Sequence, residues 1–448
     1  MSRAIIHPFR GVLRGNIQCP RDKSLSHRAV MIGALSQGET EITGFLVCQD
    51  CLATVECVRA LGVDIQIFPE EERVIVQSEG LSALREPENV LNAENSGTTI
   101  RLLSGIATGI EGLTVLTGDQ SLRKRPMHRI IEPLRQTGVE IGGRAQDNFP
   151  PLFVRGSARV KSIRYTLRVP SAQVKSALIF AALKGDTPSL IEEPVSSRDH
   201  TENMLRYVGA HIEKENATIV VEPCRELQAR SFALPGDASS AAFLVALATL
   251  LPGSCVTIHD VGINPHRTGF FRCLERMGGR FKFSNQKEEF GEPRADLEVE
   301  SSSLRGIEIG KDLIPSLIDE IPILAILATQ AEGRTTISGA EELRVKESDR
   351  LTSIVQGLRS LGVEVEERAD GFVLDGPVPF QGGRVKSFGD HRIAMSFVIA
   401  GFVAQRSVVI EDVDCIRISY PRFFQDLVTL GCDTFTLLNS QETREVEG

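Results

Sequence analysis

The stretch AVMIGALSQGETEITGFLVCQDCLATVECVRALGV, residues 29–63, contains the pattern that decides the fold. Its small apolar residues at 29–35 predict a helix, and the β-branched run at 40–43 predicts a short strand. A second, amphipathic helix follows and should end at Gly62, where glycine can act as a C-terminal cap. Short strands beyond this glycine complete a segment of the form β-α-β-α-β-β.

The same pattern recurs along the chain, and each copy ends its second helix at a glycine. Six such glycines follow one another at intervals of 69 to 84 residues: Gly62, Gly138, Gly209, Gly278, Gly362 and Gly431. One copy cannot bury its own apolar faces, so neighbouring copies must stack. The six repeats therefore predict an α/β (α+β) fold of two similar domains, each built from three βαβαββ repeats.

The division into domains follows from where the repeats begin. We predict one domain at residues 20–236 and the other at residues 1–19 together with 237–448. Residues 1–18 join the second of these because they contain two strands and no helix pair of their own. The chain then crosses between the domains twice, and this two-stranded connection predicts a hinge with the active site in the interdomain cleft.

The composition excludes several classes of protein. Apolar residues make up 42% of the 448 residues and charged residues 24%, as in ordinary globular proteins. The 59 acidic residues exceed the 50 basic ones, and the net charge of −9 argues against nucleic-acid binding through bulk charge. The longest apolar stretches, such as 241–252, are shorter than the ~20 residues that cross a bilayer, and the N-terminus lacks a signal-peptide pattern. We therefore expect a cytoplasmic protein with no nucleic-acid or membrane partner.

The nine cysteines and eight histidines do not indicate a metal site. Cys48 and Cys51 form a lone CxxC with Cys57 nearby, and no second ligand pair follows at similar spacing. We interpret these cysteines as small apolar side chains. An odd number of scattered cysteines is typical of reduced thiols in the cytoplasm.

The placement of charge within the repeats is the main functional signal. Polar clusters precede the first helix of each repeat, and helix N-termini bind anions through free N–H groups and the helix dipole. N-capping alone explains Ser239 and Ser240. It does not explain cations beside the positive end of a helix, which are unfavourable unless an anion binds there too. These cations are Lys23, Arg28, Arg101, Lys175 and Arg392.

A second group of charges lies before the second helix of some repeats. Residues 123–125 form a basic run, which is commonly a solvated loop. In the run 344–350 we predict Lys346 and Arg350 at positions i and i+4 of one helix, with Glu347 beside their shared face. A surface salt-bridge ladder would produce the same pattern.

Two carboxylates, Asp319 and Glu347, are candidates for acid–base chemistry among these cations. Arginine and lysine match phosphate and carboxylate groups. The sequence contains no Walker glycine loop, no GxGxxG unit and no GxSxG elbow. The expected ligand is therefore a small, multiply anionic metabolite, bound without nucleotide or metal.

Nine motifs occur in order along the chain, within a resemblance that runs from about residue 4 to 433 and includes all six repeats. They are DKSLSHR (22–28), ENSGTTIR (94–101), RKRPM (123–127), PSAQVKSA (170–177), SRDHTENML (197–205), PGDASSAAF (235–243), IDEIPILA (318–325), RVKESDRL (344–351) and DHRIAMSF (390–397). Together they resemble the EPSP synthase family, the 5-enolpyruvylshikimate-3-phosphate synthases, and several of them look like its class II branch. The resemblance implies two domains of three βαβαββ repeats that close over the substrates.

The resemblance also implies a reaction. Members of the family transfer the enolpyruvyl group of phosphoenolpyruvate to the 5-hydroxyl of shikimate 3-phosphate and release phosphate. The reaction proceeds by addition and elimination through a tetrahedral intermediate, within the shikimate pathway to chorismate and the aromatic amino acids. We accordingly expect a monomeric transferase with these two small-molecule substrates and no cofactor.

Residue roles follow from the same resemblance, motif by motif. The implied catalytic residues are Asp319 as the base, Glu347 as the proton donor to the methylene carbon, and Lys23 in contact with both substrates. The residues implied for shikimate 3-phosphate are Lys23, Ser24, Arg28, Ser171, Ala172, Gln173, Arg198, Asp319 and Lys346. Those implied for phosphoenolpyruvate are Lys23, Gly97, Arg125, Gln173, Arg350 and Arg392.

The sequence departs from the family pattern at a few positions. Ile418 stands where many members have a lysine that contacts phosphoenolpyruvate, and His128 stands where glycine is common. Gly97 leaves space at a position where class II members often carry alanine. This glycine predicts sensitivity to glyphosate, an analogue of phosphoenolpyruvate.

Two rival functions use similar features. The sister enolpyruvyltransferase that acts on UDP-N-acetylglucosamine shares the fold, but it carries a loop cysteine that residues 122–127 lack. A non-catalytic anion binder could use the same cations. The two carboxylates argue against such a binder, because they would weaken anion binding.

Overall fold

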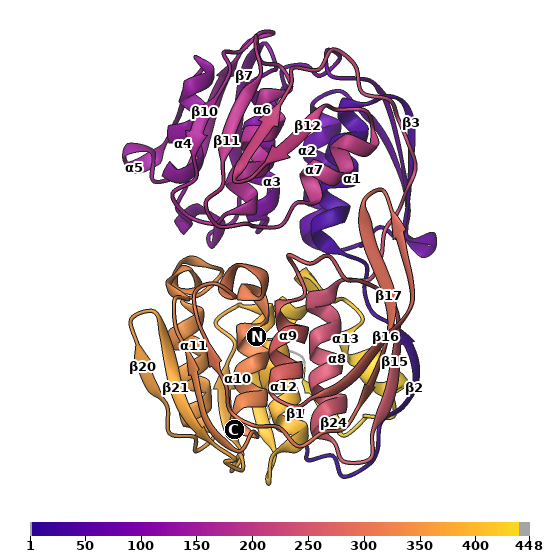
Figure 1. The fold of residues 1–448 in the computed structure, drawn as a ribbon, viewed down its shortest axis with the longest axis vertical. Coiled ribbons are helices and arrows are strands. Elements are labelled where there is room, and N and C mark those ends of the chain that lie inside the picture. Colours follow the sequence, from indigo (N-terminus) through magenta and orange to yellow (C-terminus); the bar gives the residue numbers. More distant parts are fainter. Residues whose placement is uncertain (1, 439–448) are drawn as a thin grey trace. The chain divides into compact units, whose positions relative to one another are not determined.

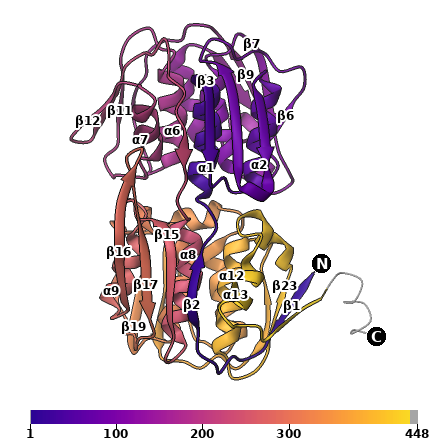
Figure 2. The ribbon, with the colours of Figure 1, turned by 90° about the vertical axis from the view of Figure 1, so that its right-hand side faces the viewer.

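The computed structural model describes residues 2–438, and the chain divides into two compact units (Figures 1 and 2). Unit 1 comprises residues 1–20, 236–287 and 293–448, and unit 2 comprises residues 21–235 and 288–292. The predicted domains extend to residues 1 and 439–448, which lie outside the described residues. The short segment 288–292 belongs to unit 2, which the repeat pattern did not predict.

Unit 2 contains three four-stranded sheets, each with two main helices. The first sheet has the order β14 (Phe232–Ala233), β3 (Gln37–Thr43), β5 (Arg73–Glu79), β4 (Asp64–Phe68), with helices α1 (Lys23–Leu35) and α2 (Gln49–Ala60). The second has the order β6 (Leu91–Asn92), β7 (Gly112–Thr117), β9 (Phe149–Gly156), β8 (Glu140–Gly143), with α3 (Gly97–Ala107), α4 (His128–Leu134) and the short α5 (Arg144–Asp147). The third has the order β10 (Arg164–Thr166), β11 (Ser189–Glu192), β13 (Thr218–Val221), β12 (Ile212–Glu215), with α6 (Ala172–Ala182) and α7 (His200–Tyr207).

Unit 1 repeats this arrangement. Its first sheet has the order β16 (Arg280–Glu289), β17 (Glu292–Glu300), β15 (Cys255–Gly262), β2 (Arg14–Gln18), with α8 (Ala238–Leu250) and α9 (Gly269–Arg276). The second has the order β18 (Glu308–Ile309), β19 (Gly333–Ile337), β21 (Gly371–Gly376), β20 (Glu366–Arg368), with α10 (Ile321–Thr329) and α11 (Arg350–Ser360). The third has the order β22 (Gly383–Lys386), β23 (Val408–Glu411), β1 (Arg3–Ile6), β24 (Phe435–Leu438), with α12 (His391–Val403) and α13 (Phe423–Thr429).

Each sheet combines one parallel pair with antiparallel neighbours. In four sheets the strand before the first helix pairs in parallel with the strand after it, as β22 does with β23. In the other two sheets these strands are exchanged between the units, so that β14, which precedes α8, pairs with β3, and β2, which precedes α1, pairs with β15. The N-terminal strands complete two sheets of unit 1, because β1 pairs with β23 and β24 and β2 pairs with β15 (Figure 2). The predicted fold class of βαβαββ repeats is thereby confirmed.

The six predicted glycine caps also hold in the structure. Each glycine follows the second helix of its repeat in the left-handed region, with φ between +83° and +103°. Residues with a side chain rarely adopt this conformation, whereas glycine does so freely. The repeated glycines therefore turn the chain from the helix into the strands that follow.

Helix α1 begins at Lys23, earlier than the predicted residues 29–35, so the polar residues before this apolar run belong to the first turns of the helix. The residue before each of five helices accepts a backbone N–H on its side chain: Asp22 from Leu25, Ser96 from Thr99, Ser171 from Val174, Asp237 from Ser239 and Asp390 from Arg392. These caps satisfy donors that a helix start leaves without partners. The sixth helix, α10, instead has Pro322 in its first turn.

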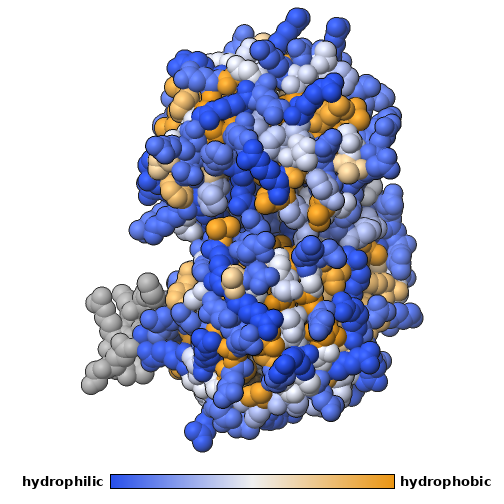
Figure 3. All heavy atoms as spheres, turned by 60° about the vertical axis from the view of Figure 1, so that its left-hand side comes forward, coloured by the Kyte–Doolittle hydropathy of each residue, from blue (hydrophilic) through white to orange (hydrophobic). Residues whose placement is uncertain are grey.

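Helices α8, α10 and α12 form the centre of unit 1. They pack against one another in pairs, and Figure 1 shows them side by side. In α8 every residue from Ala238 to Thr249 is buried. Small apolar side chains on all faces allow this close packing, whereas the second helices bury one face and are amphipathic. Figure 3 shows hydrophilic residues over much of one face of the molecule, with apolar residues scattered among them.

Candidate functional site

The start of α1 carries the first group of predicted site residues in unit 2. Lys23 is the first residue of the helix, and its Nζ lies 3.1 Å from Oδ2 of the buried Asp50. The Lys23 side chain remains 17% exposed, so its charge is partly neutralised without being sealed from solvent. Ser24 follows it, and its carbonyl oxygen accepts a hydrogen bond of 3.0 Å from Nη1 of Arg28.

Arg28, on α1, is held in place by side chains of two other helices. Its Nε donates to Thr201 Oγ1 on α7 at 2.7 Å, and its Nη2 donates to Ser176 Oγ on α6 at 2.9 Å. Burial lowers the pKa of Arg28 to about 10, against the opposing effect of the carboxylate of Glu202. The positive charge of Arg198 also lowers this pKa.

A second group surrounds the start of α3. Arg101 Nη1 donates to Gln173 Oε1 at 2.7 Å, and Gln173 Nε2 donates to Thr98 Oγ1 at 3.0 Å. A Cβ atom at Gly97 would lie 2.6 Å from Arg101 Nη1 and 3.3 Å from Arg125 Nη1. Gly97 therefore allows two guanidinium groups to approach the helix start closely.

Two further contacts complete this side of unit 2. Arg125 is buried and donates through Nη2 to Asn95 Oδ1 at 2.7 Å. Ser171 caps α6 and accepts from Val174 N at 3.4 Å, so Ala172 becomes the first helical residue beside Gln173. The structure thus brings Gly97, Arg125 and Gln173 together around Arg101.

Unit 1 gathers the predicted carboxylates around one buried arginine. Arg350 begins α11 and is 1% exposed, and its guanidinium contacts three acids: Asp319 at 3.1 Å, Glu347 at 2.7 Å and Asp390 at 2.8 Å. Although burial by itself lowers the pKa of Arg350, the charges of Asp390, Glu347 and Asp319 raise it above its ordinary value. A surface salt-bridge ladder is therefore the wrong interpretation of this segment.

Arg392 joins the same group from α12. Its Nη1 donates to the Asp319 carbonyl oxygen at 3.2 Å, and its Nε lies 3.9 Å from Asp319 Oδ1. Asp319 and Glu347 are 16% and 19% exposed, so both carboxylates remain partly accessible while they contact arginine. A pair of accessible carboxylates fixed by buried cations is suited to proton transfer.

The prediction that Lys346 and Arg350 share a helix face is wrong. Lys346 follows the short 3₁₀ helix 341–345 with extended angles of φ −84° and ψ −153°, and α11 begins only at Arg350. Asp349 caps α11 by accepting from Thr352 N, which ends the irregular segment at this point. The cap motif therefore overrides the helical spacing.

The prediction that Lys175 marks an anion-binding site is wrong. Its side chain is fully buried, and Nζ lies 2.9 Å from Glu193 Oε1 and 2.8 Å from Glu202 Oε1. Burial lowers the pKa of Lys175, but Glu202 and Glu193 outweigh this effect and raise the pKa above its ordinary value. Lys175 thus neutralises two acids inside unit 2, and this cation beside a helix start has a structural role.

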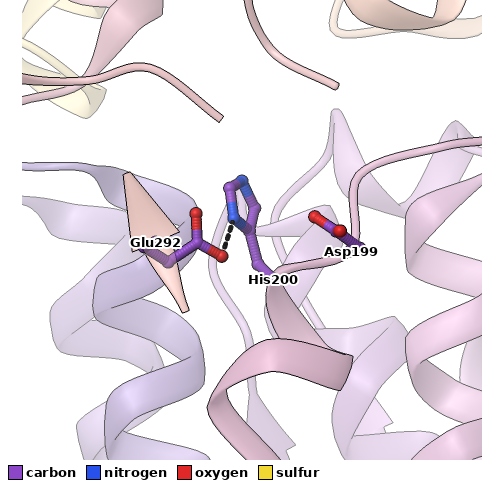
Figure 4. Close-up of side chains that lie close together, drawn as sticks. All are labelled: Asp199, His200 and Glu292. Atoms are coloured by element: carbon purple, nitrogen blue, oxygen red, sulfur yellow. Dashed lines mark hydrogen bonds and ion pairs between the residues drawn. The ribbon is translucent and has the colours of Figure 1, made fainter. Parts of the chain in front are cut away.

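One three-residue group in the described part of the chain has the side chains of a metal site. It consists of Asp199, His200 and Glu292, whose ligand atoms lie within 4.8 Å of one another (Figure 4). His200 Nδ1 lies 2.9 Å from Glu292 Oε1, which is a hydrogen-bond distance. Sequence reasoning missed this group because His200 and Glu292 are 92 positions apart. It also missed Asp50, Ser176 and Thr201, whose roles depend on neighbours far along the chain.

The repeated sheets and the arginine-rich helix starts define the enolpyruvyltransferase class of two-unit α/β proteins. The model of the family EPSP synthase (3-phosphoshikimate 1-carboxyvinyltransferase) matches residues 10–427. The chain belongs to the EPSP synthase family, which its resemblance in nine motifs had suggested.

Individual relatives agree with this family. The chain is 48% identical over 415 residues to the 3-phosphoshikimate 1-carboxyvinyltransferase of Alkaliphilus metalliredigens, covering 93% of this chain and 97% of the relative. It is 45% identical over 431 residues to the enzyme of the same name from Bacillus thuringiensis subsp. konkukian, covering 96% and 100%. A solved EPSP synthase of Acinetobacter baumannii is 38% identical, with a TM-score of 0.88 and coverage of 98% and 100%.

These relatives do not favour the rival that acts on UDP-N-acetylglucosamine.

None of the helices within residues 2–438 combines the length and the apolar character that a membrane crossing requires.

Proposed function

We propose that this chain transfers the enolpyruvyl group of phosphoenolpyruvate to the 5-hydroxyl of shikimate 3-phosphate and releases inorganic phosphate. The proposal is supported by the names of relatives that cover nearly the whole chain. The observation that carries it in the structure is the buried Arg350 with two accessible carboxylates, Asp319 and Glu347, on the same guanidinium group. An addition–elimination reaction needs a base and an acid beside a fixed cation.

In the first step, Asp319 accepts the proton of the 5-hydroxyl as this oxygen forms a bond to C2 of phosphoenolpyruvate. Glu347 donates a proton to C3, so the double bond becomes a methyl group on a tetrahedral carbon. In the second step, C3 returns a proton to Glu347, the C2–O bond to phosphate breaks, the proton held by Asp319 passes to the departing phosphate, and the enol ether and phosphate are released. Atoms and electrons balance with the two substrates alone.

The cations have a complementary role in this proposal. Arg350 and Arg392 in unit 1, and Lys23 and Arg125 in unit 2, would bind the carboxylate and phosphate of phosphoenolpyruvate, with Gly97 and Gln173 beside them. Buried or partly buried guanidinium groups bind such anions strongly, because they are preorganised and shielded from water.

Shikimate 3-phosphate would be bound by a second set of side chains. In unit 2 this set comprises Lys23, Ser24, Arg28, Ser171, Ala172, Gln173 and Arg198. In unit 1 it comprises Asp319 and Lys346. Thr201 and Ser176 already fix the guanidinium group of Arg28. The Arg28 side chain therefore loses little conformational entropy when it binds the phosphate group.

The decisive experiment is an assay of phosphate release with both substrates, together with detection of the enolpyruvyl product by mass spectrometry. Release that requires both phosphoenolpyruvate and shikimate 3-phosphate supports the proposal. Replacing shikimate 3-phosphate with UDP-N-acetylglucosamine tests the rival directly. Phosphate release with phosphoenolpyruvate and UDP-N-acetylglucosamine, but not with phosphoenolpyruvate and shikimate 3-phosphate, would overturn the proposal. Binding of phosphoenolpyruvate and shikimate 3-phosphate without phosphate release would favour the non-catalytic binder.

A further inference from the structure

Glu292 lies far along the sequence from the other residues of unit 2, yet it is part of that unit. It is the first residue of β17 and the last residue of the segment 288–292, which also contains the end of β16, and it is only 2% exposed. Its Oε1 lies 2.9 Å from His200 Nδ1 and accepts from Asn203 Nδ2 at 3.1 Å. Figure 4 shows the carboxylate of Glu292 directed toward the His200 ring.

The rest of the segment is attached to the same helix. Asn203 Nδ2 also donates to the carbonyl oxygen of Gly291 at 3.2 Å. The buried Phe290 packs with its ring centroid 6.1 Å from that of Tyr207, at the end of α7, and 5.3 Å from that of Phe232. Aromatic packing and hydrogen bonds thus fix the segment along α7 and hold Glu292 beside His200.

The first turn of α7 carries several contacts that the proposed shikimate 3-phosphate site needs. Thr201 accepts from Arg28, and Glu202 pairs with the buried Lys175. Arg198 lies two residues before His200, in the segment that leads into the helix. A shift or rotation of this turn would therefore move Arg198 directly and would release Arg28 from Thr201.

We propose that Glu292 is a positioning residue for the shikimate 3-phosphate site, acting through His200 on the first turn of α7. The inference rests on the proposed function, because it assumes that Arg28 and Arg198 bind this substrate. Glu292 itself does not touch the substrate. The charge of Glu292 raises the pKa of Arg28 against the effect of burial, which agrees with a carboxylate placed near these cations.

A metal ion in the same place fits the geometry less well. The direct contact between His200 Nδ1 and Glu292 Oε1 is a hydrogen bond, which occupies one ring nitrogen and one carboxylate oxygen of the group. Arg28 and Arg198 add positive charge nearby, and this charge would repel a cation.

The test is the variant Glu292→Ala in the full-length protein. We expect the KM and the dissociation constant for shikimate 3-phosphate to rise about tenfold or more, because a buried charge-assisted hydrogen bond is lost. The kcat should change by no more than a few fold, and the KM for phosphoenolpyruvate should stay near the wild-type value. Glu292→Gln keeps an acceptor for His200 and should restore most of the affinity. Glu288→Gln, at an exposed position of the same segment, is the matched control.

A double-mutant cycle tests whether Glu292 acts through His200. If Glu292 acts through His200, the variant combining His200→Ala and Glu292→Ala should bind shikimate 3-phosphate about as weakly as either single variant. Additive losses would contradict the proposal, as would Glu292→Ala with unchanged affinity or with a loss confined to kcat. If Glu292→Ala fails to fold by circular dichroism, His200→Ala decides instead: it should weaken binding of shikimate 3-phosphate about tenfold or more, and unchanged affinity in His200→Ala would contradict the proposal.

Two further measurements distinguish the positioning role of Glu292 from a failure of the proposed function and from a metal site. Wild-type protein that neither binds shikimate 3-phosphate nor releases phosphate would refute the proposed function, whereas wild-type binding that survives in Glu292→Ala would refute only the role of Glu292. Chelation with EDTA that abolishes substrate binding in the wild type, with recovery on addition of zinc alone, would identify a metal site and overturn the positioning role.

Discussion

Arg350 and Asp390 form an ion pair inside unit 1, with 2.8 Å between Nε and Oδ2 and side chains that are 1% and 0% exposed. Asp390 also caps α12 by accepting from Arg392 N, so one carboxylate orients a buried guanidinium and the start of the helix that bears Arg392. The two arginines proposed for phosphoenolpyruvate are therefore positioned by the same side chain. Their arrangement depends on one residue that the proposed reaction does not use.

Replacement of Asp390 should destabilise the protein. Removing one partner of a buried ion pair leaves a buried charge uncompensated, which typically costs about 3–5 kcal/mol. We expect Asp390→Asn to lower the free energy of unfolding by up to this amount. The loss should be smaller to the extent that Glu347 and Asp319, which also pair with Arg350, still neutralise its charge. Urea denaturation followed by circular dichroism measures the change. Asp375→Asn, which breaks the exposed pair with Arg334, is the control and should change the free energy of unfolding far less, because solvent screens this pair. Equal effects of the two variants would contradict the buried role of Asp390.

Glu347→Gln should impair chemistry more than binding. Glutamine keeps the size and polarity of the side chain but cannot deliver the proton to C3. General acid–base groups typically contribute about 10²–10⁴ in rate, and we expect kcat to fall by that factor. Dissociation constants for both substrates should change by only a few fold. Glu366→Gln, in an exposed pair with Arg368, provides a control that should keep normal turnover. Normal turnover in Glu347→Gln as well would remove this residue from the mechanism.

Gly97→Ala should reduce inhibition by glyphosate. The added methyl group would lie 2.6 Å from Arg101 Nη1 and 3.3 Å from Arg125 Nη1, so the guanidinium groups would have to move. We expect the wild type to be sensitive and the variant to have a higher inhibition constant, with a smaller rise in the KM for phosphoenolpyruvate. Inhibition kinetics against phosphoenolpyruvate measure both constants. A wild type that resists glyphosate would show that Gly97 does not decide sensitivity in this chain.

Chelation should leave turnover intact. The proposed reaction balances without a metal, and the one candidate ligand group within residues 2–438 already contains a hydrogen bond between His200 and Glu292. Activity after extended dialysis against EDTA should match that of an untreated sample. Loss of activity that magnesium or zinc restores would mean that the reaction requires a metal ion.

The sequence by itself determined the repeated architecture of this protein, because the signals involved are local. A glycine at a helix end, a capping Ser or Asp at a helix start and an apolar periodicity each act within a few residues. Gly62 and its five counterparts therefore predicted the turns correctly, and Asp319, Glu347 and Arg350 were singled out as candidates from their motifs. The same local logic failed at Lys346, because the cap formed by Asp349 was not weighed against helical spacing.

Only the tertiary structure decided which charged groups are buried and with whom they pair. Lys175 and Arg350 are both cations at helix starts, yet one is enclosed by Glu193 and Glu202, whereas the other holds the two accessible carboxylates. Glu292 reaches His200 across 92 positions of sequence. Pairings of this kind depend on which repeats stack together and how closely, and that information resides in the packed chain rather than in any short segment of it.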